Sequence, residues 1–315
     1  MRLEGDLPMT HLSSRRKNSA NGLTAEVLGG FGNQLFIYAT AFELSRELQC
    51  PLYLDSTWYI KNLDRSFSLD AFESTFIEIQ SNPLGRQLVI RFQESAVRAT
   101  RYGILRNTPR PTGHTFVESG FEFDPRVRLL PIGTRLRGYF QSWRYFEDSA
   151  SLIRSQMNSL RNPSAWYREQ SELISHGKNW VGLHVRRGDY LHPETREVHG
   201  IVGSDYYQQA LRIVDAIHGD MEIKVFSDDV DSARKLLENF DRPMQFIQPS
   251  LDSSPLENVL LLSKANAIVT ANSSFSWWAA WLGHGPDRTV VVPKRWFNTK
   301  PCVEKDLFLP SWIVI

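Results

Sequence analysis

Two hydrophobic patterns alternate along the chain: short, mainly apolar runs, and longer stretches in which apolar residues recur every three or four positions. The first apolar run, at 25–28, ends in a glycine-rich turn, and helical spacing follows at 35–48. The next apolar run is at 51–55. Strand, turn, helix and strand in this order are typical of a βαβ unit and therefore predict a parallel sheet.

The second half of the chain repeats this design. Its apolar runs predict four strands, at 180–185, 223–227, 267–270 and 289–292. Helical patterns at 205–217 and 232–240 separate the first three of these runs. Such alternation predicts an α/β sheet that is covered by helices on both faces.

A length of 315 residues suits two domains better than one small core. We predict a flexible N-terminal tail at 1–24, an N-terminal α/β domain at 25–170 and a C-terminal α/β domain at 171–315. Turn residues at 161–164 or at 176–179 mark the linker. Two such domains facing each other leave a cleft at the carboxyl ends of their strands, where parallel sheets bind ligands.

Charge and cysteine content argue against several classes of function. Lys and Arg number 36 against 35 Asp and Glu, a formal net charge of +1, which argues against a protein that coats nucleic acid or an anionic membrane. Cys50 and Cys302 lack CxxC or CxxH spacing, so neither a zinc site nor a disulfide framework is expected. Residues 1–24 contain no apolar signal segment, and glycines interrupt the first apolar stretch at 26–41. We therefore expect a cytoplasmic protein without a signal peptide or transmembrane segment, at most peripheral to the inner membrane.

The turn between the first strand and its helix, GGFGNQ at 29–34, is a candidate ligand site. Glycines such as Gly30 and Gly32 let backbone N–H groups approach a ligand, and the helix N-terminus that follows favours an anion. The spacing matches neither GxGxxG nor a Walker A sequence, so a purely structural turn is the alternative. Asn33 and Gln34 favour the ligand role, because their amides can donate to a phosphate or a sugar hydroxyl.

Polar residues are concentrated where the run at 180–185 ends, in HVRRGDY at 184–190. Strand alternation places His184 and Arg186 on one side of the sheet. Two arginines, a histidine and an aspartate at one strand end are costly to bury without partners, and a diphosphate would supply one through charge-assisted hydrogen bonds. An Arg–Asp ion pair across a turn is the structural alternative.

Two further strands end in polar residues. FSDD at 226–229 contains two adjacent carboxylates, Asp228 and Asp229. They could bind a divalent metal, accept hydrogen bonds from ribose or guanine, or, through Asp228, cap the next helix. NSSFSWW at 272–278 opens a helix whose N-terminal amides favour an anion. Its candidate ligand residues are Asn272, Ser273, Ser274 and Phe275.

Five motifs resemble, in this order, those of the α-1,2-fucosyltransferase family, glycosyltransferase family 11: GGFGNQLF (29–36), HVRRGDY (184–190), FSDD (226–229), NSSFSWW (272–278) and VPKRWF (292–297). The resemblance implies an inverting GT-B enzyme, with two Rossmann-like domains facing a cleft and no metal or other cofactor. Such an enzyme would move L-fucose from GDP-β-L-fucose to the 2-hydroxyl of a terminal β-galactoside, on an oligosaccharide or a lipid-linked glycan. Nucleic acid is not an expected partner.

The resemblance also implies roles for the motif residues. The N-terminal domain would take the acceptor and the C-terminal domain the GDP-sugar. Arg186 would bind the β-phosphate with His184 and Arg187 in support, and Asp228 or Asp229 would contact guanine or ribose. Further donor contacts are implied for Ser273 and Ser274 at the phosphates. Asn33 matches an asparagine near the reacting centre of protein O-fucosyltransferases.

An inverting transfer needs a group that removes the proton of the acceptor hydroxyl from within hydrogen-bond reach. Three candidates stay open. They are Asp189, Glu194, which lies ten residues after His184 like the base of core α-1,6-fucosyltransferases, and His199, in a segment that resembles a family His-Gly motif. Arg186 is a further candidate catalytic residue, because neutralising the leaving GDP supports an oxocarbenium-like transition state.

Overall fold

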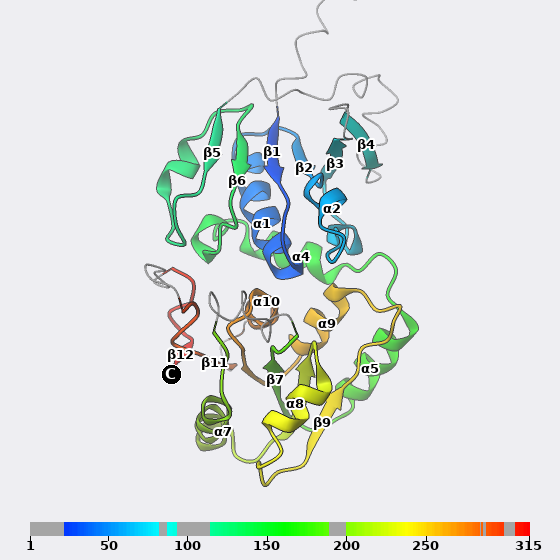
Figure 1. Ribbon diagram of the computed structural model, residues 1–315, viewed down its shortest axis with the longest axis vertical. Helices are drawn as coiled ribbons and strands as arrows, with labels where there is room; N and C mark the ends of the chain where they lie inside the picture. The colour runs from blue at the N-terminus through cyan, green and yellow to red at the C-terminus, as the bar shows by residue number, and fades with distance from the viewer. Residues whose placement is uncertain are drawn as a thin grey trace, which may run out of the picture.

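A computed structural model of the protein describes residues 22–81, 87–92, 114–188, 200–283, 285, 288–298 and 306–315. These residues form two α/β units, each built on a six-stranded sheet (Figure 1). The helices that follow β1 and β10 touch through their N-termini, so the carboxyl ends of strands in the two sheets face each other. The predicted α/β fold of the GT-B type, with two Rossmann-like sheets facing each other, is confirmed.

The first sheet has the order β4-β3-β2-β1-β6-β5, and all neighbours are parallel except β3 and β4. Its strands are β1 (Leu23–Glu26), β2 (Leu52–Asp55), β3 (Phe76–Ser81), β4 (Gln87–Phe92), β5 (Thr115–Val117) and β6 (Arg135–Arg137). The N–H of Leu23 donates to the Pro51 carbonyl oxygen at 2.9 Å. The prediction of a tail up to residue 24 is therefore wrong at its end, since Leu23 and Thr24 already pair with β2.

The second sheet has the order β12-β11-β10-β7-β8-β9 and is parallel throughout. Its strands are β7 (Trp180–Val185), β8 (Glu222–Ser227), β9 (Met244–Ile247), β10 (Ala267–Val269), β11 (Thr289–Val292) and β12 (Ile313–Val314). The four predicted strands of this half are β7, β8, β10 and β11. Every residue of β7 is buried, which accounts for its continuous apolar run.

The helices lie between the strands in the order expected of βαβ units. They are α1 (Phe31–Glu47), α2 (Trp58–Lys61), η2 (Leu69–Ala71), η4 (Pro125–Leu129), η5 (Trp143–Tyr145), α4 (Ala150–Asn158), α5 (Ala165–Ser175), α7 (Ser204–His218), α8 (Val230–Leu236), α9 (Pro255–Leu262) and α10 (Ser274–Leu282). None of the helices in the described segments combines the length and the apolarity that a bilayer span requires.

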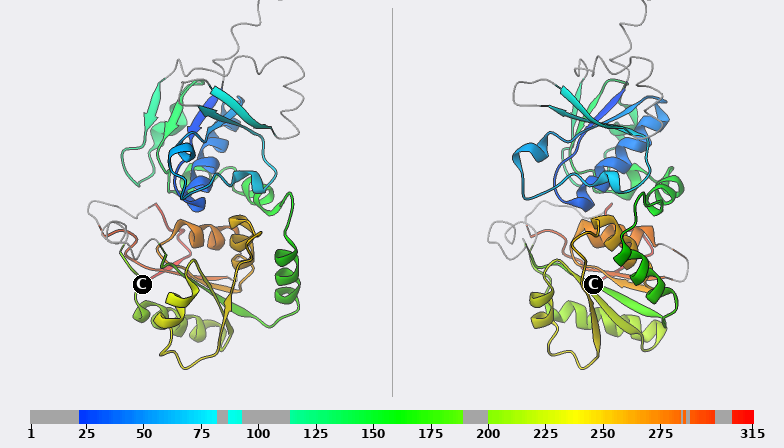
Figure 2. Two further views of the ribbon diagram at one scale, coloured as in Figure 1. Left: turned by 45° about the vertical axis from the view of Figure 1, so that its right-hand side comes forward. Right: turned by 90° about the vertical axis from the view of Figure 1, so that its right-hand side faces the viewer.

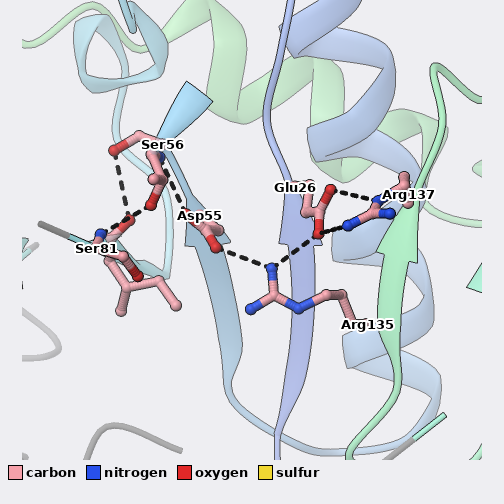
Figure 3. Close-up of polar contacts among 8 residues, drawn as sticks. Glu26, Asp55, Ser56, Ser81, Arg135 and Arg137 are labelled. Carbon is pink, nitrogen blue, oxygen red and sulfur yellow. Dashed lines mark hydrogen bonds and ion pairs between the residues drawn. The ribbon is translucent and has the colours of Figure 1, made fainter. Parts of the chain in front are cut away.

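Charged side chains tie three strands of the first sheet together. Alternation in β1 buries Leu23 and Ala25 and turns Glu26 to the other face. Arg135 of β6 pairs there with Glu26 at 3.1 Å and with Asp55 of β2 at 2.8 Å (Figure 3). Because this face is polar, β6 (RLR) has no apolar run that a sequence pattern could detect.

An aromatic cluster joins the two units. Phe36 of α1 packs on Trp277 and Trp278 of α10, with ring centroids 4.4 and 5.0 Å apart. Phe146 stacks on Trp278 at 5.4 Å, and the indole Nε1 of Trp278 donates to the Gly32 carbonyl oxygen at 2.9 Å. Both views in Figure 2 place α1 directly above α10. The units therefore share one continuous hydrophobic core.

Helix α5 belongs by its contacts to the second unit. The N–H of Ser164, its N-cap residue, donates to the Glu257 carboxylate of α9, and Lys264 lies 5.4 Å from the centre of the Tyr167 ring. The chain thus passes from one unit to the other before Ser164, upstream of the boundary expected at 170.

Candidate functional site

The candidate site lies where β7 and β8 end beside the N-terminus of α10. In the parallel register of these strands, His184 lies beside Phe226 and Val185 beside Ser227. The residues that follow the two strands, Arg186 and Asp228 among them, therefore meet at one edge of the sheet. This register brings the HVRRGDY and FSDD motifs together.

His184 is buried beneath this edge, with 3% of its surface exposed. Its ring stacks on Phe275 with centroids 5.1 Å apart, and its carbonyl oxygen accepts a hydrogen bond from the Tyr207 hydroxyl at 3.0 Å. Burial, followed by the nearby charge of Arg186, lowers the pKa of His184 to about 3, so the ring is neutral at physiological pH. Its Nδ1 has no hydrogen-bond partner among the described residues. A ligand that reached this atom would satisfy it.

Arg186 stands at the same edge and is more exposed. Its Nη1 pairs with Asp228 Oδ2 at 3.2 Å, while Asp228 Oδ1 accepts the N–H of Arg187 at 2.8 Å. A side chain at Gly188 would collide with the Asp228 carboxylate, so glycine is needed for this close approach. This ion pair joins Arg186 to an aspartate of the neighbouring strand end. The pair considered from the sequence, across the turn to Asp189, lies outside the described residues.

Arg187 holds the backbone around the site. It is 8% exposed, and its Nη2 donates to the Val202 carbonyl oxygen at 3.3 Å. Burial lowers the pKa of its guanidinium. The bond ties the end of β7 to the segment that leads into α7.

The two adjacent aspartates have different partners. Asp229 is the N-cap of α8: its Oδ1 accepts the N–H of Ser232 at 3.0 Å, and its Oδ2 accepts the Ser232 hydroxyl at 2.6 Å. These bonds lower the pKa of Asp229. A cap at Asp228, one of the three roles left open by the sequence, is wrong, because Asp229 has the extended backbone of the cap residue. Asp228 is therefore the carboxylate that faces Arg186.

The N-terminus of α10 closes the other side of the site. Asn272 is buried, and its Nδ2 donates to the Trp296 carbonyl oxygen at 3.2 Å. Ser273 is the N-cap residue, and its side chain makes no capping hydrogen bond. Ser274 begins the helix directly against Gly32 of α1, where an added Cβ would lie 2.5 Å from the Ser274 carbonyl carbon. Gly32 thus serves the contact between the units.

The remaining residues of the glycine turn also have protein partners. Gly30 is the N-cap of α1. Gln34 donates from Nε2 to the Ser66 carbonyl oxygen at 2.8 Å and accepts at Oε1 from the Ser68 N–H at 2.9 Å. These two bonds occupy both the nitrogen and the oxygen of the Gln34 amide. Gln34 therefore braces the 66–68 loop in this structure and does not present its amide to a sugar-nucleotide donor. Asn33 Oδ1 accepts from Gln141 Nε2 at 2.8 Å.

A pocket opens between the ends of β7, β8 and α9, and its lining includes His184, Arg186, Asp228, Asn258 and Phe275. Sequence reasoning missed Asn258, because an asparagine inside the apolar pattern of α9 carries no motif. Its Nδ2 donates to the Ser254 carbonyl oxygen at 3.1 Å, while its buried Oδ1 has no partner among the described residues. The lining of the pocket therefore includes unsatisfied polar atoms on two uncharged side chains, His184 Nδ1 and Asn258 Oδ1.

The three candidate bases, Asp189, Glu194 and His199, lie outside the described residues. In the part of the chain that is described, the carboxylates close enough to share a metal ion are Glu43, Glu47 and Asp148. They lie at the C-terminal end of α1, on the order of 20 Å along the helix from its N-terminus at the site.

Comparison with known proteins gives one family and several relatives. Residues 124–315 match the model of glycosyl transferase family 11. The chain is 29% identical to the O-antigen biosynthesis glycosyltransferase WbnK of Escherichia coli, over 90% of this chain and 97% of that protein. It is 28% identical to an alpha-1,2-colitosyltransferase of Escherichia coli, over 90% and 97% of the two chains. A galactoside alpha-(1,2)-fucosyltransferase 1 of Leontocebus fuscicollis is 28% identical over 58% of this chain and 52% of that protein.

Proposed function

The chain belongs to glycosyl transferase family 11 and is a glycosyltransferase, and from this premise we propose that it transfers L-fucose from GDP-β-L-fucose to the 2-hydroxyl of a terminal galactoside. The α-1,2 linkage and the galactoside are supported by the names of the relatives, a galactoside alpha-(1,2)-fucosyltransferase among them. The acceptor would be an oligosaccharide or a lipid-linked glycan, reached from the cytoplasm with at most a peripheral association with the membrane.

The observation that carries the donor assignment is the polar pocket at the end of β7. Guanine has N–H groups that would donate to Asn258 Oδ1. It also has ring nitrogens that would accept a hydrogen bond from His184 Nδ1, when the neutral imidazole carries its one proton on that atom. Arg186 stands at the mouth of the same pocket, where its guanidinium can grip phosphate oxygens. A base-sized pocket next to a phosphate ligand favours a nucleotide diphosphate over an uncharged sugar alone.

The proposed reaction is a single displacement. The acceptor oxygen forms a bond to C1 of fucose as the bond from C1 to the GDP oxygen breaks, and the configuration at C1 inverts. The acceptor proton passes to Asp189, Glu194 or His199, and the electron pair leaves with GDP. Arg186, together with Ser273, Ser274 and the N-terminal amides of α10, would stabilise the charge on the departing diphosphate.

We further propose that this charge is neutralised without a metal ion. Asp228 is paired with Arg186 and Asp229 caps α8, so both carboxylates of the FSDD motif have protein partners. Two arginines and a helix N-terminus supply the positive charge that a divalent cation would otherwise bring.

The test is chromatography of a panel of β-galactosides after incubation with GDP-fucose in EDTA. We expect a fucosylated product whose new linkage is α-1,2. A panel without any fucosylated product would contradict the proposal, and activity that is lost in EDTA and restored by Mn²⁺ would contradict its metal-free part.

A second candidate is transfer of another sugar from its GDP-activated form. The colitosyltransferase relative favours it, because that protein is as identical to this chain as the galactoside alpha-(1,2)-fucosyltransferase is, and over more of its length. Both candidates use the same nucleotide pocket. A competition assay with different GDP-sugars at equal concentration would separate them, since the true donor gives the higher kcat/KM.

A further inference from the structure

Glu118 is a half-buried residue with a buried carboxylate oxygen, at the cleft edge of the first unit, and none of the motifs includes it. It directly follows β5, and its N–H donates to the Arg137 carbonyl oxygen at 2.9 Å, which continues the pairing with β6. Its Oε2 accepts the N–H groups of Tyr139 at 2.7 Å and Phe140 at 2.9 Å. The other oxygen, Oε1, is buried without a hydrogen-bond partner among the described residues. An oxygen that is buried without a partner costs free energy, and the two hydrogen bonds at Oε2 offset part of this cost.

The turn that Glu118 holds has an unusual backbone. Phe140 is fully buried and has φ of +52°, a conformation that bulky residues rarely adopt. Gly138 has φ of +155°, and a side chain there would collide with Glu118. Two N–H groups fixed on one carboxylate oxygen stabilise this strained backbone, and without them the turn is free to relax.

The 138–141 turn places two side chains, Tyr139 and Gln141, against the glycine turn at the start of α1. The Tyr139 ring lies beside Gly29, where an added Cβ would be 3.3 Å from Tyr139 Cε1. Gln141 is buried, and its Nε2 donates to Asn33 Oδ1 at 2.8 Å. Asn33 follows Gly32, the residue in contact with the N-terminus of α10. The position of the Asn33 amide in the cleft therefore depends on the 138–141 turn.

We propose that Glu118 is a positioning residue of the transfer reaction: its carboxylate fixes the 138–141 turn, and Gln141 on this turn fixes the Asn33 amide at the acceptor side of the cleft. The proposal rests on the proposed function for the reaction itself, but not on the identity of the transferred sugar. It predicts an effect on turnover of the bound complex and not on the affinity for the nucleotide, whose pocket lies in the other unit.

Glu78 of β3 provides a matched control. It is a buried carboxylate in the same sheet, and it accepts a hydrogen bond from the Ser56 hydroxyl at 2.6 Å. Burial raises the pKa of Glu78 as it does that of Glu118. It holds no turn at the glycine motif, so loss of this carboxylate reports the general cost of altering a buried acid in the first sheet.

The experiment compares Glu118→Ala, Glu118→Gln and Glu78→Ala with the full-length wild type at pH 8, using whichever GDP-sugar the wild type transfers. We expect Glu118→Ala to lower kcat about 10- to 100-fold, the loss that follows from small misplacement near a reacting centre, with the Kd for GDP within about twofold. Glu118→Gln keeps an oxygen that can accept both N–H groups and should retain kcat within about threefold. Hydrogen exchange of the Tyr139 and Phe140 amides should accelerate in Glu118→Ala alone.

Three results would overturn the proposal: wild-type kcat in Glu118→Ala, an equal loss of kcat in Glu78→Ala, or a loss of kcat without faster exchange at the two amides. If the wild type transfers no fucose but does transfer another sugar, the proposed donor fails while the role of Glu118 is still tested. Melting temperatures of all variants identify any that fail to fold, and Gln141→Ala, which leaves the Glu118 bonds intact, then supplies the kcat and Kd measurement.

Discussion

The two walls of the cleft meet beside Gly32 of α1 and Ser274 of α10, yet they use their polar groups differently. In the first unit the polar side chains beside this contact are bonded to the protein: Gln34 to the 66–68 loop, and Asn33 to Gln141. In the second unit, His184 Nδ1 and Asn258 Oδ1 have no partner among the described residues. The first unit also contains buried oxygens without a described partner, Glu118 Oε1 and Gln141 Oε1, but its motif residues Asn33 and Gln34 are held in place by the protein. In the second unit, the unsatisfied atoms line the pocket itself and leave hydrogen bonds for a ligand to complete.

The largest expected effect tests GDP binding by the second unit. Arg186→Ala removes the guanidinium at the mouth of the pocket, and charge-assisted bonds to a diphosphate are lost with it. We expect GDP affinity to fall about 100-fold, or close to 3 kcal/mol, and transfer to become undetectable, while the melting temperature changes little. Calorimetry with GDP measures the affinity. Arg137→Ala is the control, because Arg137 pairs with Glu26 on the first sheet (Figure 3); an equal loss of affinity in both variants would contradict the comparison.

The next effect concerns the contact between the walls. In Gly32→Ala the new Cβ would lie 2.5 Å from the Ser274 carbonyl carbon and 2.6 Å from the Phe275 nitrogen, so one of the two helices must move. We expect the free energy of unfolding to fall by about 3 kcal/mol, the upper range for overpacking. Chemical denaturation measures it. Gly120→Ala is the matched control, since no atom of the described residues lies within 4 Å of a Cβ at Gly120.

A smaller effect separates the charge of Glu118, in the first unit, from its hydrogen bonding. Burial, which outweighs the two N–H bonds, raises the pKa of Glu118 from 4.5 to about 7, and Asp124 adds to the rise. A carboxyl group with a raised pKa in the folded state binds protons more tightly there, so its contribution to stability is present below pH 4.5 and lost as pH rises to 7. Glu118→Gln removes this loss. We expect the variant to gain about 2 kcal/mol relative to wild type between pH 5 and pH 8.

Urea unfolding at both pH values measures this gain, with the exposed Glu122→Gln as a control for the change of charge. Tyr139 and Tyr145, which also lie near Glu118, keep their protons over this range because their pKa values are raised. A gain in the stability of Glu118→Gln that does not depend on pH would show that burial does not destabilise the ionised carboxylate of Glu118.

The sequence predicts those parts of the two walls that depend on apolar runs. The strands β1, β2, β7, β8, β10 and β11 were predicted from short, mainly apolar runs, and burial of every residue makes the run of β7 continuous. Strands β5 and β6 were missed, since three residues with charged neighbours carry no periodicity, and their stability comes from partners far along the chain, such as Glu26 for Arg135. Family membership was predicted correctly because five motifs kept their order.

The site was predicted less evenly. Motif position identified His184 and Arg186, but the partner of Arg186 could only come from the register of β7 and β8, which no local pattern encodes. Asn258 and Glu118 were missed for the same reason: each meets the cleft through tertiary contacts of an otherwise ordinary element. Gln34 looked like a ligand residue because its amide can donate, yet the 66–68 loop takes both of its amide groups.

The smallest effect tests whether the adjacent aspartates have separate roles, Asp229 as the cap of α8 and Asp228 as the partner of Arg186. Asp229→Ala removes the cap of α8, whose two bonds to Ser232 are local, so we expect a loss of about 1 kcal/mol in stability and no change in GDP affinity. Asp228→Ala should weaken GDP binding and leave the stability unchanged. It removes a carboxylate that pairs with Arg186 and lines the pocket, without touching the helix cap. Thermal unfolding and calorimetry on both variants measure the two properties. If Asp229→Ala weakened GDP binding as much as Asp228→Ala does, the two carboxylates would act as one site, and the binding wall would extend from the end of β8 onto α8.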